Sequence, residues 1–424
     1  MTILIVAALL FFLIAIDVPI AVALGSTAIV MIYYVAGLPV LSIAQKLFTA
    51  LDKFALMAIP FFVLAGAFLS EGGTAKRIIN FAHSMVGHLP GGLTMTSILA
   101  CAIFAAVSGS GPATVAAIGS IMIPAIREAG YSDTFAIGSI TTAGSLGILI
   151  PPSIVLIVYG VTVDQSIGDL FLAGVVPGIV IAGMMMALTY IMARKAGFKK
   201  TQPMPWKDRF KTFVDSFWAL MLIVIIIGGI YSGLFTPTEA AAVSAVYAFF
   251  VAKFIYRDLS WKEVPNVILK ASATSAMILF IIANAMLFAY FLTIEQIPQQ
   301  LSDMIIQAHV SKIMFLAGVN ILLIIFGAFM EPSSIVMVTA PLFFPVAVHL
   351  GVNPIQLGII YTINMGVGEI TPPVGLNLFV AMGITGKSIE YITKTTLPWF
   401  LTYLVGLLLA TYIPQLSLII FKLF

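Results

Sequence analysis

Charged side chains are scarce in this sequence of 424 residues. Asp, Glu, Lys and Arg make up 9% of it, hydrophobic residues make up 61%, and the mean hydropathy is +1.14. A soluble protein carries roughly a quarter charged residues, whereas apolar runs near the ~20 residues that span a bilayer recur along this chain. We therefore predict an all-α, polytopic membrane protein, because a β-barrel would show alternating segments of about ten residues.

Cysteine and the common catalytic motifs are also missing. The single Cys101 excludes an internal disulfide bond, and no Cys/His spacing indicates zinc. The sequence has no G-x-x-x-x-G-K-[ST], no H-E-x-x-H and no G-x-S-x-G. Ser108 and Ser110 have no neighbouring His to activate them. We therefore expect a protein that is not an enzyme, with no ATPase subunit and no nucleic-acid partner.

The most polar segment, residues 194–211, lies near the middle of the chain, and seven of its residues are Lys or Arg. The positive-inside rule makes it a cytoplasmic linker. The halves on either side, 1–193 and 212–424, resemble each other. "GILIPP" at 147–152 matches "GEITPP" at 368–373, and "PAIREAGYS" at 124–132 matches "PVAVHLGVN" at 345–353, with the same offset in both pairs. This is an internal duplication, and counting crossings from the linker makes the two repeats inverted.

Three kinds of element are expected in each repeat besides ordinary spans. The polar segments at about 40–53 and 257–267 are predicted to be amphipathic arm helices at the interfaces. Short apolar pieces predict re-entrant hairpins at about 92–127 and 313–349. Gly and Pro predict broken spans at about 133–163 and 355–385. Non-helical backbone at membrane depth is tolerated only where protein or a water-filled cavity covers it.

These interruptions are typical of a binding site. The hairpin tips are 108–112 and 330–334, and the spans break near 141–152 and 364–373. Proline removes an amide donor and glycine permits unusual dihedral angles, so each break frees carbonyl oxygens and a half-helix N-terminus. The oxygens suit a hard cation and the N-termini attract an anion. Simple kinks are the alternative, but breaks at equivalent positions of inverted halves favour a transporter's midplane site.

Two carboxylates, Glu331 and Glu369, lie within these apolar stretches. Intramembrane carboxylates are costly and usually functional. Either residue could balance a bound cation, carry a proton for coupling, or make a structural hydrogen bond, and the sequence leaves the three roles open.

These segments resemble the large membrane subunit of tripartite ATP-independent periplasmic (TRAP) transporters. The resemblance covers essentially the whole chain and is carried by "VSGSGPATVAAIGSIMIPA" (107–125), "TTAGSLGILIPPSI" (141–154), "FMEPSSIVMVTAPLFFPVA" (329–347), "GEITPPVGLNLF" (368–379) and "TYIPQLSL" (411–418). It implies an elevator-type, sodium-coupled importer of an organic acid in the bacterial inner membrane. It also implies a small four-span membrane subunit, expected to be a separate polypeptide, and a periplasmic substrate-binding protein.

The resemblance also implies where the ligands bind. About two Na⁺ sites are expected, the first at Ser108, Ser110, Gly144 and Ser145, and the second at Met330, Ser333, Gly366 and Thr371. The substrate is expected between them, with candidate residues Gly109, Gly111, Pro112, Pro151, Pro152, Ser334, Pro372, Pro373 and Asn377. The sequence offers no Arg or Lys at midspan for the substrate's carboxylate, so half-helix N-termini, hydroxyls and sodium are expected to supply the positive field.

We therefore expect sodium-coupled import of sialic acid or a C4-dicarboxylate, with a slight preference for sialic acid that has no physical argument behind it. A stand-alone sodium- or proton-coupled carboxylate carrier is the alternative, and an ion channel is a weaker one.

Overall fold

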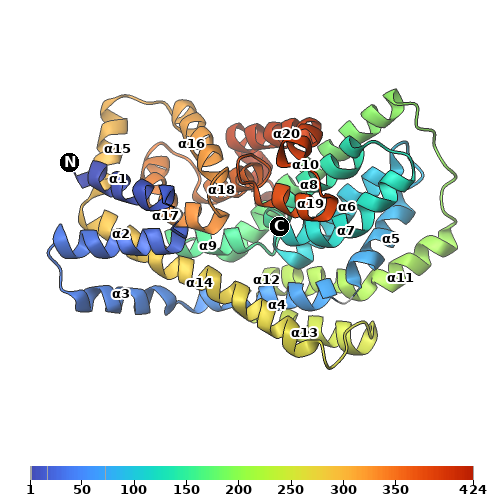
Figure 1. Cartoon of the computed structure of the whole chain (residues 1–424), viewed down its shortest axis with the longest axis horizontal. Helices are drawn as coiled ribbons and strands as arrows, with labels where there is room; N and C mark the ends of the chain where they lie inside the picture. The colour runs from blue at the N-terminus through green and yellow to red at the C-terminus, as the bar shows by residue number, and fades with distance from the viewer. Residues whose placement is uncertain (1, 17, 72, 424) are drawn as a thin grey trace.

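The computed structural model describes residues 2–16, 18–71 and 73–423, and the regular elements in that part of the chain are helices (Figure 1). Some of them are long and apolar enough to cross a bilayer alone. Among them are the single helices α10 (Ile167–Lys195), α14 (Val264–Ile294), α17 (Pro332–His349) and α20 (Ile389–Tyr412). The others are longer helical stretches: Phe54–Glu71 contains α4 (Ala58–Glu71), Trp206–Tyr231 begins with α11 (Trp206–Ile223), and Pro237–Ile255 begins with α13 (Pro237–Phe250). The predicted all-α, polytopic fold is confirmed.

The helices recur in the same order in the two halves. α6 (Gly92–Ser108) and α7 (Gly111–Glu128) form one hairpin, and α16 (Lys312–Gly327) and α17 form the other. The starts of α7 and α17 have the same offset as the matching sequence segments. Four crossings separate α4 from its counterpart α14: the first broken span, α10, α11 and α13. The two equivalent helices therefore cross in opposite directions, as inverted repeats require.

Both broken spans are interrupted at adjacent prolines. In the first half, helical residues 134–148 stop before Pro151-Pro152, and α9 (Ile154–Val163) follows. In the second half, α18 (Pro354–Gly368) stops before Pro372-Pro373, and α19 (Leu376–Thr385) follows. The peptide bond between the two prolines is cis in both places. The breaks expected from the sequence are thus present at equivalent positions.

The two expected arm helices differ. At the first position a helix is present, α3 (Val40–Leu51), and it ends before Lys53, whose backbone is extended. The second, expected over 257–267, is wrong: residues 257–263 are loop and turn, and α14 begins at Val264 and continues unbroken to Ile294. Beyond Pro265 no Gly or Pro interrupts this stretch, so the second half fuses into one helix what the first half divides between α3 and α4.

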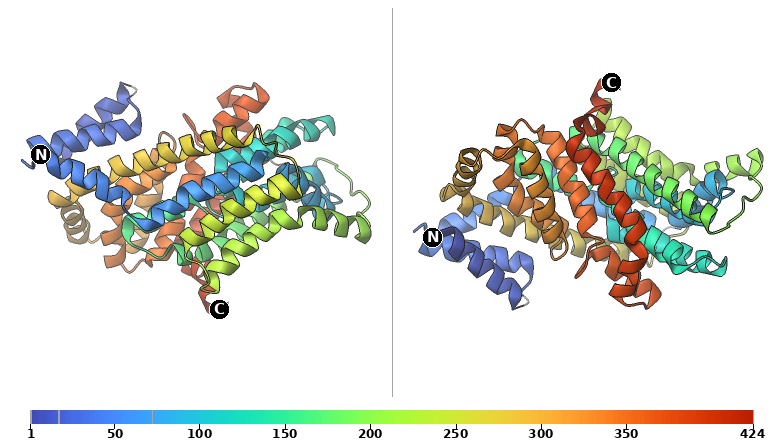
Figure 2. Two further views of the ribbon diagram at one scale, coloured as in Figure 1. Left: turned by 90° about the horizontal axis from the view of Figure 1, so that it is seen from below. Right: turned by 90° about the horizontal axis from the view of Figure 1, so that it is seen from above.

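The repeats interlock. α7 of the first half packs against α19 of the second, and α17 of the second half packs against α9 of the first. α10 and α20 also contact each other. A separate layer is made by α2 (Ile20–Tyr34), α4, α13 and α14, which pack on one another along one side of the molecule (Figures 1 and 2). We call these four helices the frame, and the hairpins with the broken spans the central bundle.

Candidate functional site

The first hairpin tip is a short non-helical link between α6 and α7. α6 ends at Ser108, and Gly109 takes a left-handed conformation (φ 63°), which glycine adopts without penalty. Ser110 is extended, and its hydroxyl accepts a hydrogen bond from the amide of Ala113 as the N-cap of α7. The Ser108 hydroxyl lies 2.9 Å from that of Thr114. Hydroxyl and carbonyl oxygens are thereby concentrated at one end of a hairpin.

The second tip has the same plan with a carboxylate in place of the serine. α16 ends at Gly327, and Glu331 is the N-cap of α17. Its carboxylate accepts hydrogen bonds from the Ser333 hydroxyl (2.9 Å) and from the Ser334 amide (3.1 Å). The partial positive charge of this helix N-terminus is therefore met by an acidic group of the protein itself.

Asn377 and Glu369 of the second half contact the first half close to its hairpin tip. Asn377, on α19, donates its side-chain amide to Glu369 Oε2 (3.2 Å) and to the hydroxyl of Ser145 in the first half (3.0 Å). The carbonyl of Ser145 accepts a further hydrogen bond from the buried Tyr403 hydroxyl (3.1 Å). Glu369 is 3% exposed, and a side chain on Gly111 would collide with its carboxylate. A carboxylate of the second repeat thus lies directly against the tip of the first.

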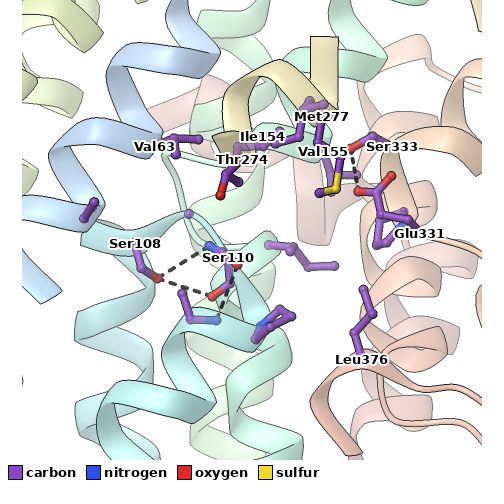
Figure 3. Close-up of a pocket in the computed structure, with 18 of the residues that line it drawn as sticks. Val63, Ser108, Ser110, Ile154, Val155, Thr274, Met277, Glu331, Ser333 and Leu376 are labelled. Carbon is purple, nitrogen blue, oxygen red and sulfur yellow. Dashed lines mark hydrogen bonds between the residues drawn. The ribbon is translucent and has the colours of Figure 1, made fainter. Parts of the chain in front are cut away.

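The two tips face one cavity of about 380 Å³ (Figure 3). Ser108 and Ser110 line it from the first tip, and Glu331 and Ser333 line it from the second. Glu369 also contributes. The opposite wall belongs to the frame: Val63, Gly66, Ala67 and Ser70 of α4, and Lys270, Ala271, Thr274, Met277 and Ile278 of α14. The cavity therefore lies between the central bundle and the frame, with hydroxyls and carboxylates on the bundle side.

The structure brings the predicted first cation site together. A Cβ on Gly144 would lie 3.3 Å from the carbonyl oxygen of Gly111, and one on Gly147 would lie 2.5 Å from that of Ser110. Gly144 and Ser145 therefore pack directly under the tip that contains Ser108 and Ser110. The carbonyl oxygen of the Asn377 side chain is buried beside them and has no hydrogen-bond partner in the described part of the chain. Neutral oxygens with a nearby carboxylate fit a hard cation such as Na⁺.

The predicted second cation site is looser. Ser333 is bonded to Glu331, whereas the hydroxyl of Thr371 donates to its own preceding turn, at Val367 (2.7 Å). A side chain on Gly366 would meet the Tyr403 hydroxyl, so this glycine faces α20. Met330 packs at the edge of the hydrophobic core. The α16 end and the second broken span do approach each other, since the Val374 amide donates to the Ala328 carbonyl (3.0 Å).

The substrate candidates divide into two groups. Gly109 and Pro112 line the cavity, Gly111 abuts Glu369, and the carbonyl of Pro152 lies against Gly109. The others are not brought to the cavity wall: Ser334 is buried behind Glu331, Asn377 is buried between the repeats, Pro151 lines a separate apolar hollow, and Pro372 and Pro373 are exposed.

Sequence reasoning missed Lys270. This residue lies two turns into α14 and lines the cavity. The available signal was a lysine inside an otherwise apolar stretch of the sequence, the one that forms α14. Lys270 lies near the start of α14 rather than at its middle, so it does not contradict the expectation that no Arg or Lys lies at midspan.

The family of the chain follows from a family model described as "Tripartite ATP-independent periplasmic transporter, DctM component", which matches residues 7–416. The chain belongs to this TRAP transporter family. It is therefore a transporter component rather than an enzyme, and a multi-pass protein of the bacterial inner membrane. TRAP systems carry out secondary transport with a periplasmic binding protein and a small membrane subunit.

Individual relatives cover nearly the whole chain. The chain is 50% identical over 432 residues to the "C4-dicarboxylate TRAP transporter large permease protein DctM" of Rhodobacter capsulatus, covering 99% of this chain and 98% of the relative. It is 35% identical over 381 residues to the "Sialic acid TRAP transporter large permease protein SiaM" of Vibrio cholerae, covering 90% and 89%. The crystal structure of the Alcanivorax borkumensis YdaH transporter matches with a TM-score of 0.63, 17% identity and 90% coverage of both chains, which shows a shared fold.

Proposed function

We propose that this TRAP subunit imports a small organic acid together with sodium ions, and that a C4-dicarboxylate is the acid. The observation that carries the proposal is the cavity on which both hairpin tips converge. Its bundle side presents hydroxyl and carbonyl oxygens with two carboxylates, which suit Na⁺. The N-terminus of α7, whose N-cap is the neutral Ser110, adds partial positive charge, and sodium bound near Glu369 would add the rest of the positive field for a carboxylate.

The choice of acid rests on the relatives and on the size of the cavity. The relative named for C4-dicarboxylates is 50% identical to the chain, against 35% for the one named for sialic acid. About 380 Å³ lies near the lower end of the range for small-ligand sites. Both observations support a small dicarboxylate over the larger sugar acid, which reverses the slight preference taken from the sequence.

Transport is proposed to occur by an elevator mechanism, in which the central bundle moves as a rigid body against the frame. Two features support this. The cavity separates the two units, and its frame wall is mostly small and apolar, as at Val63, Ala67 and Ala271. A wall of this kind makes few specific polar bonds that sliding would have to break.

Proton coupling is the second candidate, because Glu331 and Glu369 both line the cavity. In that mechanism one carboxylate would take up a proton on the outside and release it inside.

The stand-alone carrier and the ion channel differ from the proposed transporter in their requirements. The carrier needs no binding protein, and the channel needs no ion gradient to couple transport.

The test is uptake of labelled succinate into proteoliposomes that contain the chain, its small membrane subunit and its binding protein. We expect uptake to require an inward sodium gradient and both partner proteins, and to be inhibited by unlabelled fumarate more strongly than by sialic acid. Uptake that persists after the sodium gradient is collapsed, but stops when a proton gradient is collapsed, would favour proton coupling instead.

A further inference from the structure

Lys270 brings a positive charge to a largely apolar cavity whose other polar side chains are hydroxyls and carboxylates. Among the described residues that line the cavity it is the sole Lys or Arg. One face of α14 fronts the cavity, because Thr274, Met277 and Ile278 follow Lys270 at the i+4, i+7 and i+8 positions. Lys270 comes first along this face, on the side where α14 begins, and its side chain is 73% exposed. It therefore stands at the mouth of the cavity.

The partner of Lys270 is weakly held. Its ammonium lies 3.1 Å from Glu71 Oε1 at the end of α4, and the Glu71 side chain is 50% exposed. Ion pairs between solvent-exposed side chains contribute little to stability. An incoming carboxylate can therefore replace Glu71 on Lys270 at small cost, whereas a buried, multiply bonded pair would resist the exchange.

The inner part of the cavity supplies the complementary half of a two-ended site. Ser108 and Ser110 present hydroxyls beside the N-terminus of α7. One carboxylate of a substrate is proposed to bind there with sodium. A monocarboxylate would need nothing more, and its uncharged end would lie beside a lysine. A dicarboxylate would have a second charge to place, and the frame wall of the cavity offers Lys270 for it.

We propose that Lys270 binds the second carboxylate of a dicarboxylate substrate and releases Glu71 as it does so. Lys270 is then a substrate-binding residue contributed by the frame, and it selects for two negative charges. The inference rests on the proposed function, because it assigns Lys270 as the binding partner of the second carboxylate of the same substrate.

The test compares succinate with monomethyl succinate, which keeps the carbon chain and loses one charge. Dissociation constants for both are measured by calorimetry, at saturating sodium, on the chain with its small subunit in nanodiscs. An ion pair with an exposed lysine contributes up to about 1 kcal/mol, which corresponds to a change of up to about fivefold in the dissociation constant. We expect Lys270→Gln to weaken succinate binding about three- to fivefold and to leave monomethyl succinate binding unchanged. Lys270→Arg should restore most of the preference, and Glu71→Gln should strengthen succinate binding about two- to threefold.

Lys262→Gln is the matched control, since this lysine is exposed near the same end of α14 and does not line the cavity. Succinate binding that is unchanged in Lys270→Gln, or lost equally with its monoester, would overturn the inference while leaving the proposed function intact. A wild-type complex that binds neither compound would overturn the dicarboxylate assignment itself.

Discussion

The two hairpin tips have the same backbone plan and differ in the charge of the N-cap residue. Ser110 and Glu331 occupy equivalent positions of the two repeats as the N-caps of α7 and α17, and each accepts a hydrogen bond from the amide three residues further on. At α17 the N-cap is the Glu331 carboxylate of the same repeat, whereas at α7 the N-cap is a hydroxyl, and the carboxylate that lies against Gly111 is Glu369 of the other repeat. The first tip therefore carries no charged N-cap of its own, whereas the second carries a carboxylate.

The halves also differ in which of them supplies charge. The position equivalent to Glu369 in the first half is Ile148, so the first half has no carboxylate of its own at its break. It receives one from the second half, because Glu369 lies against Gly111 and shares Asn377 with Ser145. The two predicted cation sites are therefore not equivalent copies, and the same acid can influence both.

The largest expected effect comes from removing that shared charge with Glu369→Gln. This change keeps the shape and removes a buried negative charge (3% exposed). A buried charge paired with a bound cation contributes far more than an exposed one. We expect sodium-driven succinate uptake in proteoliposomes to fall at least about tenfold, and the sodium concentration for half-maximal uptake to rise.

Glu390→Gln, at an exposed position on α20, is the control and should transport normally. Full sodium-driven uptake by Glu369→Gln would show that Glu369 neither balances sodium nor relays protons, and the two halves would then be electrostatically independent.

A somewhat smaller effect is expected from Gly111→Ala. The new methyl group would collide with the Glu369 carboxylate, so the acid must move away from the first tip. Uptake should fall about three- to tenfold although Glu369 keeps its charge. This variant therefore tests the position of the carboxylate, whereas Glu369→Gln tests its charge. Gly183→Ala on α10, where no atom lies within 4 Å of the added carbon, should behave like wild type in the same assay.

Much of this site could be predicted from local sequence. A helix cannot pass through adjacent prolines unbroken, so Pro151-Pro152 and Pro372-Pro373 predicted the breaks, and the constant offset between the repeats paired them. Convergence of the tips on one cavity followed from inverted repeats. These features depend on short segments whose conformation is decided by the residues within them.

The features that sequence reasoning missed depend on contacts between distant segments. Asn377 reaches Ser145, 232 residues away, and no local pattern reveals that pairing. Lys270 lines the cavity because α14 packs beside α4. The second arm helix was predicted from polarity at 257–267, but the uninterrupted helix formers after Pro265 joined its last residues to α14.

Asn377→Ala tests the bridge between the halves and should have a moderate effect. The side-chain amide of Asn377 donates to Ser145 and to Glu369, and losing it leaves two buried acceptors without a donor, at a cost of about 1–3 kcal/mol. We expect the sodium concentration for half-maximal uptake to rise about three- to tenfold. Asn266→Ala, at an exposed position on α14, is the control. An unchanged sodium dependence would mean that the halves bind cations without this bridge.

The smallest effect concerns a charge pair found in the first half alone. Arg127, at the end of α7, donates to Asp133 (2.6 Å), whereas the equivalent positions of the second half are Val348 and Pro354. The hydrogen bond from Arg127 holds the pKa of Asp133 below its usual value. The contribution of this pair to the free energy of unfolding is therefore complete above the ordinary carboxyl pKa of about 4. It is lost as the pH falls through the lowered pKa of Asp133 in the folded protein.

Asp133→Asn should lower the melting temperature of the purified protein at pH 7 by the equivalent of no more than about 1 kcal/mol, since both side chains are partly exposed. The difference from wild type should shrink as the pH is lowered below about 4 towards 3, because Asp133 then becomes protonated in the unfolded wild-type protein, while its lowered pKa keeps it ionised to lower pH in the folded protein. Asp303→Asn, at an exposed position in α15 (Ile297–Gln307), should match wild type at both pH values. A difference between Asp133→Asn and wild type that is independent of pH would assign the effect to packing against Tyr391, whose hydroxyl also donates to Asp133 (2.9 Å), instead of to charge.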